Sequence, residues 1–459
     1  MTLRHARAVP WWLGPTILGI GLLAALGCGW AQRATPEPEA NVLTLEQAMR
    51  LALERNPSMA IAEGGVVAQR AALAGQRARR LPTVTADAGG RIQQSLARPV
   101  NVGGGVIETR AATTETSDIT LALSHAFFQS GLDEAIAAAR AQTAASEASL
   151  VDTQRTLLLQ VAQSFFTVLA DQELAAAADE AVRAAQLHLE LVDARIEAGT
   201  AAPADRLPVE AELAEAQFEA VSTLNAIWQA LADLQALLAL PADELPLIRG
   251  ELAEVPPRGE LQRWLATALA ERPDLQAQRH RTRATELALR QAEISAGLTL
   301  SAQGQADYGR HTGTTGETWS LAAGVSYPLF DRQARASVDQ ARANLEVARQ
   351  RQAELELSIA REVTQAWYAL SDAEERVTTA GVALAAAASS LEAARERYAE
   401  GVADIIEVTD AEVTWRRATA RLIQARYDRS VAYHRLLAAG GVLRLETSGE
   451  GDAGTESQP

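Results

Sequence analysis

Three carboxylates, Asp404, Glu407 and Asp410, follow Gly401 at spacings of three residues. Because residues three apart lie on one face of a helix, their side chains can point the same way. Carboxylates aligned in this way can line a path for cations. They can equally be ordinary charges at the start of a helix, where they complement its positive end, or part of a solvated face. No acid–base or nucleophilic partner lies nearby in the chain, so the stretch indicates electrostatics rather than catalysis.

The remaining reactive residue types show no catalytic, metal or cofactor pattern. All 42 basic residues are Arg, and the lack of Lys excludes a P-loop lysine and a Schiff-base lysine. No GxSxG nucleophile elbow occurs. No histidine pair sits at ligand spacing with a carboxylate, so we expect no metal site, and we interpret His188 and His434 as helix-surface residues. We expect neither an enzyme nor a cofactor, and the net charge of −16 argues against nucleic acid as a partner.

Residues 1–31 indicate a signal peptide. Arg4 and Arg7 give a basic start, residues 11–26 an apolar core, and small residues follow; a retained membrane anchor is the alternative. The sequence ALGC, ending at Cys28, is similar to a lipoprotein box and would make Cys28 a lipidation site, whereas the residues after it suit ordinary signal peptidase. Beyond residue 31 no run approaches about 20 apolar residues, so any membrane crossing should use strands.

The mature chain repeats one plan twice. Three pairs of motifs recur in the same order: LALERNP (51–57) with TALAERP (267–273), VAQSFFTVL (161–169) with VTQAWYAL (363–370), and ARIEAG (194–199) with ERYAEG (396–401). We place the first repeat at 41–240 and the second at 260–445. A Pro-rich linker at 241–259 joins them, and an acidic, disordered tail follows at 446–459.

Each repeat should contain a helix, a pair of strands, a very long helix, a turn and a returning helix. Residues 132–198 contain no Gly or Pro and residues 332–400 contain one Gly, so each can form a helix about 100 Å long. Their apolar residues step by three and four, as in a coiled coil. The other expected helices are 46–81, 209–240, 260–296 and 402–439.

Between these helices the apolar period changes to that of a strand. Residues 297–308 and 318–328 alternate apolar with small or polar side chains, as do 119–127 and, more weakly, 84–88. Such strands suit a transmembrane barrel with a wet interior, but also a soluble sheet with one solvated face. The signal peptide and the helix lengths favour the barrel. Four strands cannot close a barrel alone, so this interpretation requires an oligomer.

From Leu43 to about Leu445 the chain resembles the TolC-type outer membrane efflux family. The likeness rests on LTLEQAMRLALERNP near the start, YPLFDRQAR (327–335) and RYAEGVADIIEVTDAE (397–412), within the duplicated order. The resemblance implies a mostly helical fold of duplicated coiled-coil hairpins. It also implies a homotrimer in which four strands per chain form one twelve-stranded barrel. This barrel would lie in the outer membrane lipid of a Gram-negative bacterium. The helices would continue as a periplasmic tunnel that meets a periplasmic adaptor and an inner-membrane pump.

The resemblance also assigns roles to the two glycine turns, as hairpin tips at the narrow tunnel entrance. The tip residues that would contact the adaptor are Gly199, Thr200, Gly401 and Val402. The residues that would form rings of carboxylates, one from each subunit, are Asp205, Asp404, Glu407 and Asp410.

The chain departs from the family at both tips. Some members carry an Arg two residues after the second glycine, where this chain has Ala403, so the latch that this Arg makes is in doubt. PADRLP (203–208) places two prolines after the first turn, which should stiffen that tip and delay the start of its helix.

We expect a passive duct for small molecules, such as drugs or other toxic compounds. The same duct could serve metal or protein export, because its wall contacts cargo non-specifically. An exported coiled-coil scaffold or adhesin without a channel is the other alternative.

Overall fold

The computed structural model describes residues 42–103, 105–109, 111–252, 255–256, 258–311 and 314–445. The predicted signal peptide, Cys28 and the acidic tail lie outside these residues. The chain divides into two units, Met1–Asn41 and Val42–Pro459, and every element named below belongs to the second.

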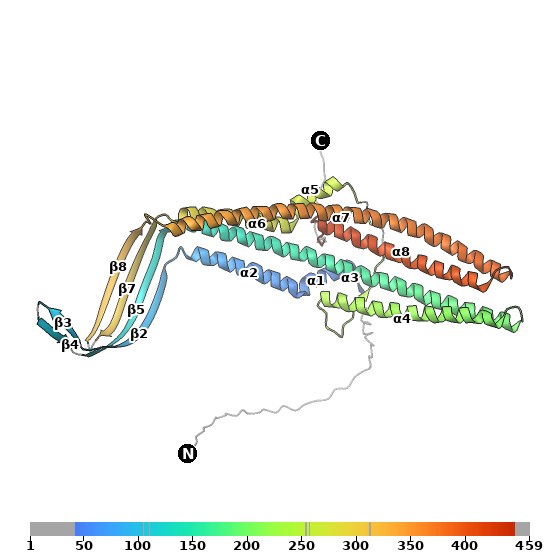
Figure 1. Cartoon of the computed structure of the whole chain (residues 1–459), viewed down its shortest axis with the longest axis horizontal. Coiled ribbons are helices and arrows are strands. Elements are labelled where there is room, and N and C mark those ends of the chain that lie inside the picture. The colour runs from blue at the N-terminus through green and yellow to red at the C-terminus, as the bar shows by residue number, and fades with distance from the viewer. Residues whose placement is uncertain are drawn as a thin grey trace, which may run out of the picture. The chain divides into compact units, whose positions relative to one another are not determined.

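Two long helical hairpins dominate this unit (Figure 1). The helices α3 (Leu132–Glu197) and α7 (Arg332–Ala399) have 66 and 68 residues and end one residue before the predicted bounds. Each packs along a returning partner, α4 (Arg206–Leu237) or α8 (Ile405–Ala439). The predicted long helices are therefore confirmed. Their Ala, Leu, Glu and Arg residues favour helix, and they contain almost no residue that would break one.

The helices that cover the long pair are each broken at a proline. We predicted single helices at 46–81 and 260–296, and this is wrong. The observed helices are α1 (Leu45–Arg55), α2 (Pro57–Ala78), α5 (Leu261–Glu271) and α6 (Pro273–Ser295). Proline fits the first position of a helix but cannot donate the N–H that would continue the preceding one. The residues before the prolines, Asn56 and Arg272, are accordingly extended.

One antiparallel sheet of four strands lies at the end of the helices opposite the hairpin turns, with the strand order β2-β5-β7-β8 (Figure 1). Its strands are β2 (Thr83–Ser95), β5 (Ala112–Gln129), β7 (Thr299–His311) and β8 (Thr314–Ser326). Because β5 pairs with β7, both repeats contribute to one sheet. Among the described strands, β2 and β8 each pair on one side only, so the sheet has two open edges.

Two smaller strand pairs were not predicted. A hairpin of β3 (Arg98–Val102) and β4 (Gly105–Thr109) lies between β2 and β5 in the chain. A parallel pair of two-residue strands, β1 (Val42–Leu43) and β6 (Leu247–Ile248), ties the start of the unit to the segment predicted as a linker. The two-residue strands β1 and β6 are too short for an alternating pattern to reveal them, whereas the five-residue strands β3 and β4 were missed.

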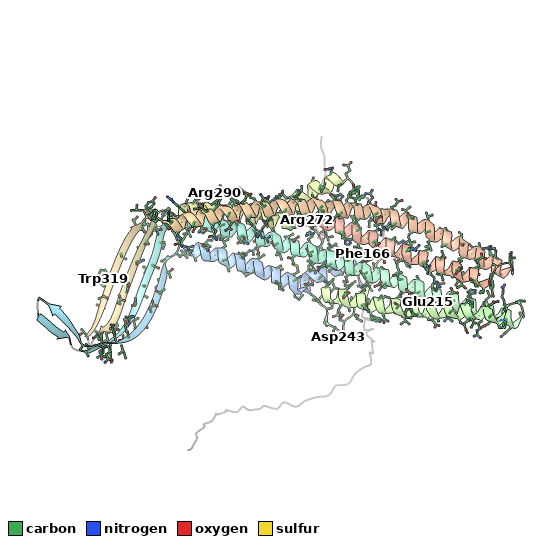
Figure 2. The ribbon with its side chains drawn as sticks, viewed as in Figure 1. Phe166, Glu215, Asp243, Arg272, Arg290 and Trp319 are labelled. Carbon is green, nitrogen blue, oxygen red and sulfur yellow. The ribbon has the colours of Figure 1, made fainter. Side chains whose placement is uncertain are left out.

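The four-stranded sheet has an exposed apolar face and a polar face. One row of cross-strand neighbours is apolar: Ala86, Leu121, Ala306 and Trp319. The next row, on the opposite face, is polar: Asp87, Thr120, Asp307 and Thr318. Trp319, labelled on the sheet in Figure 2, is 81% exposed, and Leu321 is 75% exposed. Within the described part of the chain no second layer covers this apolar face, which favours barrel strands over a sandwich.

The main core of the helical part lies along the middle of α3. Phe165, Val161 and Val168 are almost fully buried and pack with Leu234 and Leu238 from the end of α4. Of the helices in the described ranges, α7 alone contains an 18-residue stretch apolar enough to cross a membrane by length and composition. Only 17% of that stretch is buried, and α7 packs against α6 and α8.

Candidate functional site at the hairpin tips

Both hairpins turn at a glycine in the left-handed region, with φ of +70° at Gly199 and +75° at Gly401. In the second tip Gly401 N–H donates to the Tyr398 carbonyl at 3.1 Å, and Val402 N–H donates to the Arg397 carbonyl at 2.9 Å. The first tip is closed by the same two bonds. This is the Schellman arrangement, in which glycine avoids the strain that a side chain would meet at positive φ. The geometry accounts for a glycine at each predicted turn.

The returning helices start at different distances from their glycines. In the first hairpin a single 3-10 turn, Pro203–Asp205, precedes α4, which begins at Arg206. In the second hairpin α8 begins at Ile405, directly after Asp404. The delayed start predicted from the prolines of PADRLP is therefore confirmed.

The four predicted acidic residues lie at the tips. The spacing predicted that Asp404, Glu407 and Asp410 share one helical face, but Asp404 lies outside the helix. Asp404 precedes α8 as its N-cap and is extended, so only Glu407 and Asp410 are helical. Glu407 forms an ion pair with Arg397 of α7, whereas Asp410 is exposed. Asp205 accepts a backbone N–H from its own turn at 3.1 Å. The spacing rule failed at Asp404 because it holds only within a helix.

Arg195, from the last turn of α3, joins the two tips. Its Nη1 donates to the Tyr398 carbonyl at 2.9 Å and its Nη2 to the Ala399 carbonyl at 3.0 Å, while the guanidinium lies 4.3 Å from the Tyr398 ring centroid. A cation placed on the last carbonyls of α7 complements the negative end of that helix. The sequence prediction missed this role. The available signal was an Arg four residues before each glycine, in ARIEAG and ERYAEG, where Arg397 instead pairs within its own hairpin.

A buried polar cluster lies between the hairpins, behind the tips. It contains His188 of α3, Glu212 of α4 and Glu412 of α8, which are 7%, 6% and 4% exposed. The His188 Nδ1 atom lies 3.6 Å from Glu212 Oε2 and 4.0 Å from Glu412 Oε2. The outer oxygens face cations: Arg395 Nη2 is 2.7 Å from Glu412 Oε1, and Arg416 Nη2 is 3.6 Å from Glu212 Oε1.

The interpretation of both histidines as surface residues is wrong. His188 lies on the face of α3 that meets the other hairpin, with its ring edge-on to Tyr398. His434 is partly buried beside Phe166, at 4.9 Å between ring centroids, and burial lowers the pKa of His434. In a helix bundle with packing on several sides, an Ala-rich helix has no clearly polar face from which such positions can be predicted.

Charge in the buried cluster is unevenly shared. Burial, and then the neighbouring Glu212, raise the pKa of Glu412 to about 7. Burial also acts to raise the pKa of Glu212, but contacts with His188 and Glu412 outweigh it, and the pKa of Glu212 lies below its ordinary value. Of the two carboxylates, Glu412 is therefore the one that holds a proton below about pH 7.

Long helical hairpins with glycine tips, joined to a sheet whose apolar face is exposed, define a class of proteins whose strands suit a membrane and whose helices extend beyond it. The sequence pattern described as outer membrane efflux protein matches residues 48–240 and 264–442. The chain belongs to that family, whose members are channels of the outer membrane that extend into the periplasm.

Individual relatives agree with this assignment. The chain is similar to the outer membrane efflux protein BepC of Brucella suis biovar 1 (strain 1330), with 24% identity over 328 residues, which cover 68% of this chain and 69% of BepC. Its fold is similar to that of the CmeC outer membrane channel of Campylobacter jejuni, with a TM-score of 0.74, 18% identity, and coverage of 87% and 85% of the two chains. The MtrE outer membrane channel of Neisseria gonorrhoeae, in its open state, gives a TM-score of 0.73 at 22% identity, with coverage of 88% and 90%.

Proposed function

We propose that three copies of this chain form the outer-membrane exit duct of a tripartite export system. The observation that carries the proposal is the four-stranded sheet, which has an exposed apolar face, a polar face and two open edges among the described strands. Pairing β2 of one chain with β8 of the next would satisfy both edges and enclose the polar face. Three such sheets would make one twelve-stranded barrel, and the hairpins would continue it as a periplasmic tunnel.

The duct would conduct small molecules, including drugs or other toxic compounds, without an energy source of its own. Membership of the outer membrane efflux family supports this role, with an inner-membrane pump and a periplasmic adaptor as partners. The adaptor would contact the hairpin tips at Gly199, Thr200, Gly401 and Val402. These residues stand at the turns, and Val402 is 75% exposed.

In the trimer, the acidic tip residues would form rings around the entrance. Asp404 and Asp410 are exposed, whereas the charge of Glu407 is balanced by Arg397 of its own chain. The carboxylate of Asp205 is held by its own turn. Carboxylate rings favour cations, so the preference of the entrance for cations should depend mainly on Asp404 and Asp410.

Planar bilayers containing the purified protein test this function. We expect stepwise, cation-preferring conductance that loses its cation preference in the double variant Asp404→Asn/Asp410→Asn. The matched control, Glu293→Gln, removes an exposed charge from α6, away from the tips, and should leave selectivity unchanged. Trimers that do not conduct would contradict the duct, and conductance indifferent to the double variant would contradict the acidic rings.

A strain lacking the gene separates the possible cargoes. Small-molecule export predicts increased sensitivity to several toxic compounds, restored by the wild-type gene. Unchanged drug sensitivity, together with lost secretion of a protein or increased sensitivity to one metal, would assign the duct to the corresponding alternative cargo.

A further inference from the structure

The buried cluster between the hairpins leaves several polar atoms without partners. Within the described residues, neither ring nitrogen of His188 has a hydrogen-bond partner, and neither does Oε2 of Glu212. Burying polar groups without such bonds is costly, so each of these atoms calls for an explanation. One possible ligand atom from each of His188, Glu212 and Glu412 nevertheless lies within 4.8 Å of the other two.

We propose that His188, Glu212 and Glu412 bind one divalent transition-metal ion of the zinc class, which links the first helical hairpin to the second. The three ligands would be Nδ1 of His188 and one carboxylate oxygen each from Glu212 and Glu412. A water molecule would take the fourth position of a tetrahedral site. The site lies roughly three helical turns from either glycine. Asp410 is only two residues before Glu412, but it is exposed whereas the three ligands are buried.

The distances favour a metal over direct hydrogen bonds. The separations of 3.6 and 4.0 Å from His188 Nδ1 to the two carboxylate oxygens exceed normal hydrogen bonds. Two ligands of a tetrahedral zinc ion, each about 2.0–2.2 Å from the metal, lie about 3.3–3.6 Å apart. The two separations from His188 Nδ1 would therefore need to shorten by at most about 0.7 Å, which side-chain rotation can supply.

The surroundings hold the carboxylates in position for a metal. Arg395 and Arg416 contact the outer oxygens of Glu412 and Glu212 and leave the inner oxygens facing His188. Such contacts outside the ligand shell orient metal-binding carboxylates. The side chain of Arg395 is 51% exposed, so solvent screens part of its charge, whereas that of Arg416 is 23% exposed and is screened less. The mixed nitrogen and oxygen donors suit zinc better than Mg²⁺ or Ca²⁺, which prefer oxygen alone.

A metal at this point would fasten the two hairpins. His188 and Glu212 come from α3 and α4, whereas Glu412 comes from α8. An ion that binds only when the three helices are together stabilises that arrangement in proportion to its concentration and affinity. The metal would thus favour the present packing of the tips over any state in which the hairpins separate.

Zinc titration of the full-length protein in detergent, after chelator treatment and tag removal, tests the proposal. We expect one Zn²⁺ per chain, retained through gel filtration and not displaced by excess Mg²⁺ or Ca²⁺. The variants His188→Gln and Glu412→Gln should weaken binding by more than about 100-fold. Two controls should bind like wild type: His280→Gln, at an exposed histidine of α6, and Asp404→Asn/Asp410→Asn at the tips.

Measurements on wild-type protein test the metal site even if a variant fails to fold. Replacement of Zn²⁺ by Co²⁺ should give the visible absorption of a four-coordinate site. Wild-type trimers that retain no zinc would overturn the proposal and leave a cluster that shares a proton. The proposal would also be overturned if folded Glu412→Gln still bound one zinc ion per chain, or if the tip control Asp404→Asn/Asp410→Asn lost zinc binding. Either result would place the metal elsewhere.

Discussion

Replacing Gly401 with Ala should loosen the second hairpin tip, whereas the same replacement at Gly381, within α7, should tighten that helix. A Cβ atom added at either position would meet no atom within 4 Å, so crowding contributes to neither change. The backbone alone then decides the sign. At Gly401 φ is +75°, a conformation that costs an alanine about 1–2 kcal/mol. At Gly381 the backbone is helical, and alanine should gain about 1 kcal/mol there.

Hydrogen exchange followed by mass spectrometry measures both effects in detergent-solubilised protein. For Gly401→Ala, we expect amides at the end of α7 to exchange about 5–30 times faster. For Gly381→Ala, we expect slower exchange around residue 381, and peptides from the sheet should be unaffected in both variants. Unchanged exchange at the tip of Gly401→Ala would refute the claim that the left-handed glycine closes the turn.

Three further changes test the polar contacts of the helices. In chelator-treated protein, the free energy of unfolding should fall as pH rises from about 4.5 to 7, because the folded chain keeps the proton of Glu412 and the unfolded chain loses it. Glu412→Gln should remove up to about 3 kcal/mol of this decrease, as measured by unfolding at each pH. Arg195→Gln should speed hydrogen exchange at both tips, since it breaks one partly buried and one exposed hydrogen bond, which at ordinary strength contribute about 1–3 kcal/mol in total. Arg272→Met should destabilise the protein by about 3 kcal/mol in thermal or denaturant unfolding, because the buried Arg272 pairs with Asp274 at 2.6 Å between Nη2 and Oδ2. As a control, Arg444→Met breaks an exposed ion pair with Glu271 and should cost less than about 1 kcal/mol.

The large elements could be predicted from the sequence because their signals are local and long. The helices α3 and α7 followed from stretches almost free of Gly and Pro, and β5, β7 and β8 from alternation over about ten residues. The alternation at 84–88 was weaker, and β2 extends well beyond it, over Thr83–Ser95. The tip glycines followed from a single Gly between two helical patterns. Pro57 and Pro273 are local signals for the breaks between the shorter helices, because the residue before a proline is biased away from the helical region.

The contacts between elements could not be predicted in the same way. His188, Glu212 and Glu412 come from three helices far apart in the chain, so no spacing rule brings them together. The bridge from Arg195 to α7 ends on backbone carbonyls, which carry no sequence signal. The position of Asp404 outside α8 depended on where the helix starts, and helix ends are the least predictable part of an element.

The central claim is that three chains share their strands to enclose one bore. A single-particle structure of the purified protein in detergent tests this most directly. We predict a threefold assembly in which β2 of each chain pairs with β8 of its neighbour, giving a closed barrel of twelve strands that continues into the helical tunnel. A structure in which each sheet is closed or covered within its own chain, without a continuous bore, would contradict the account.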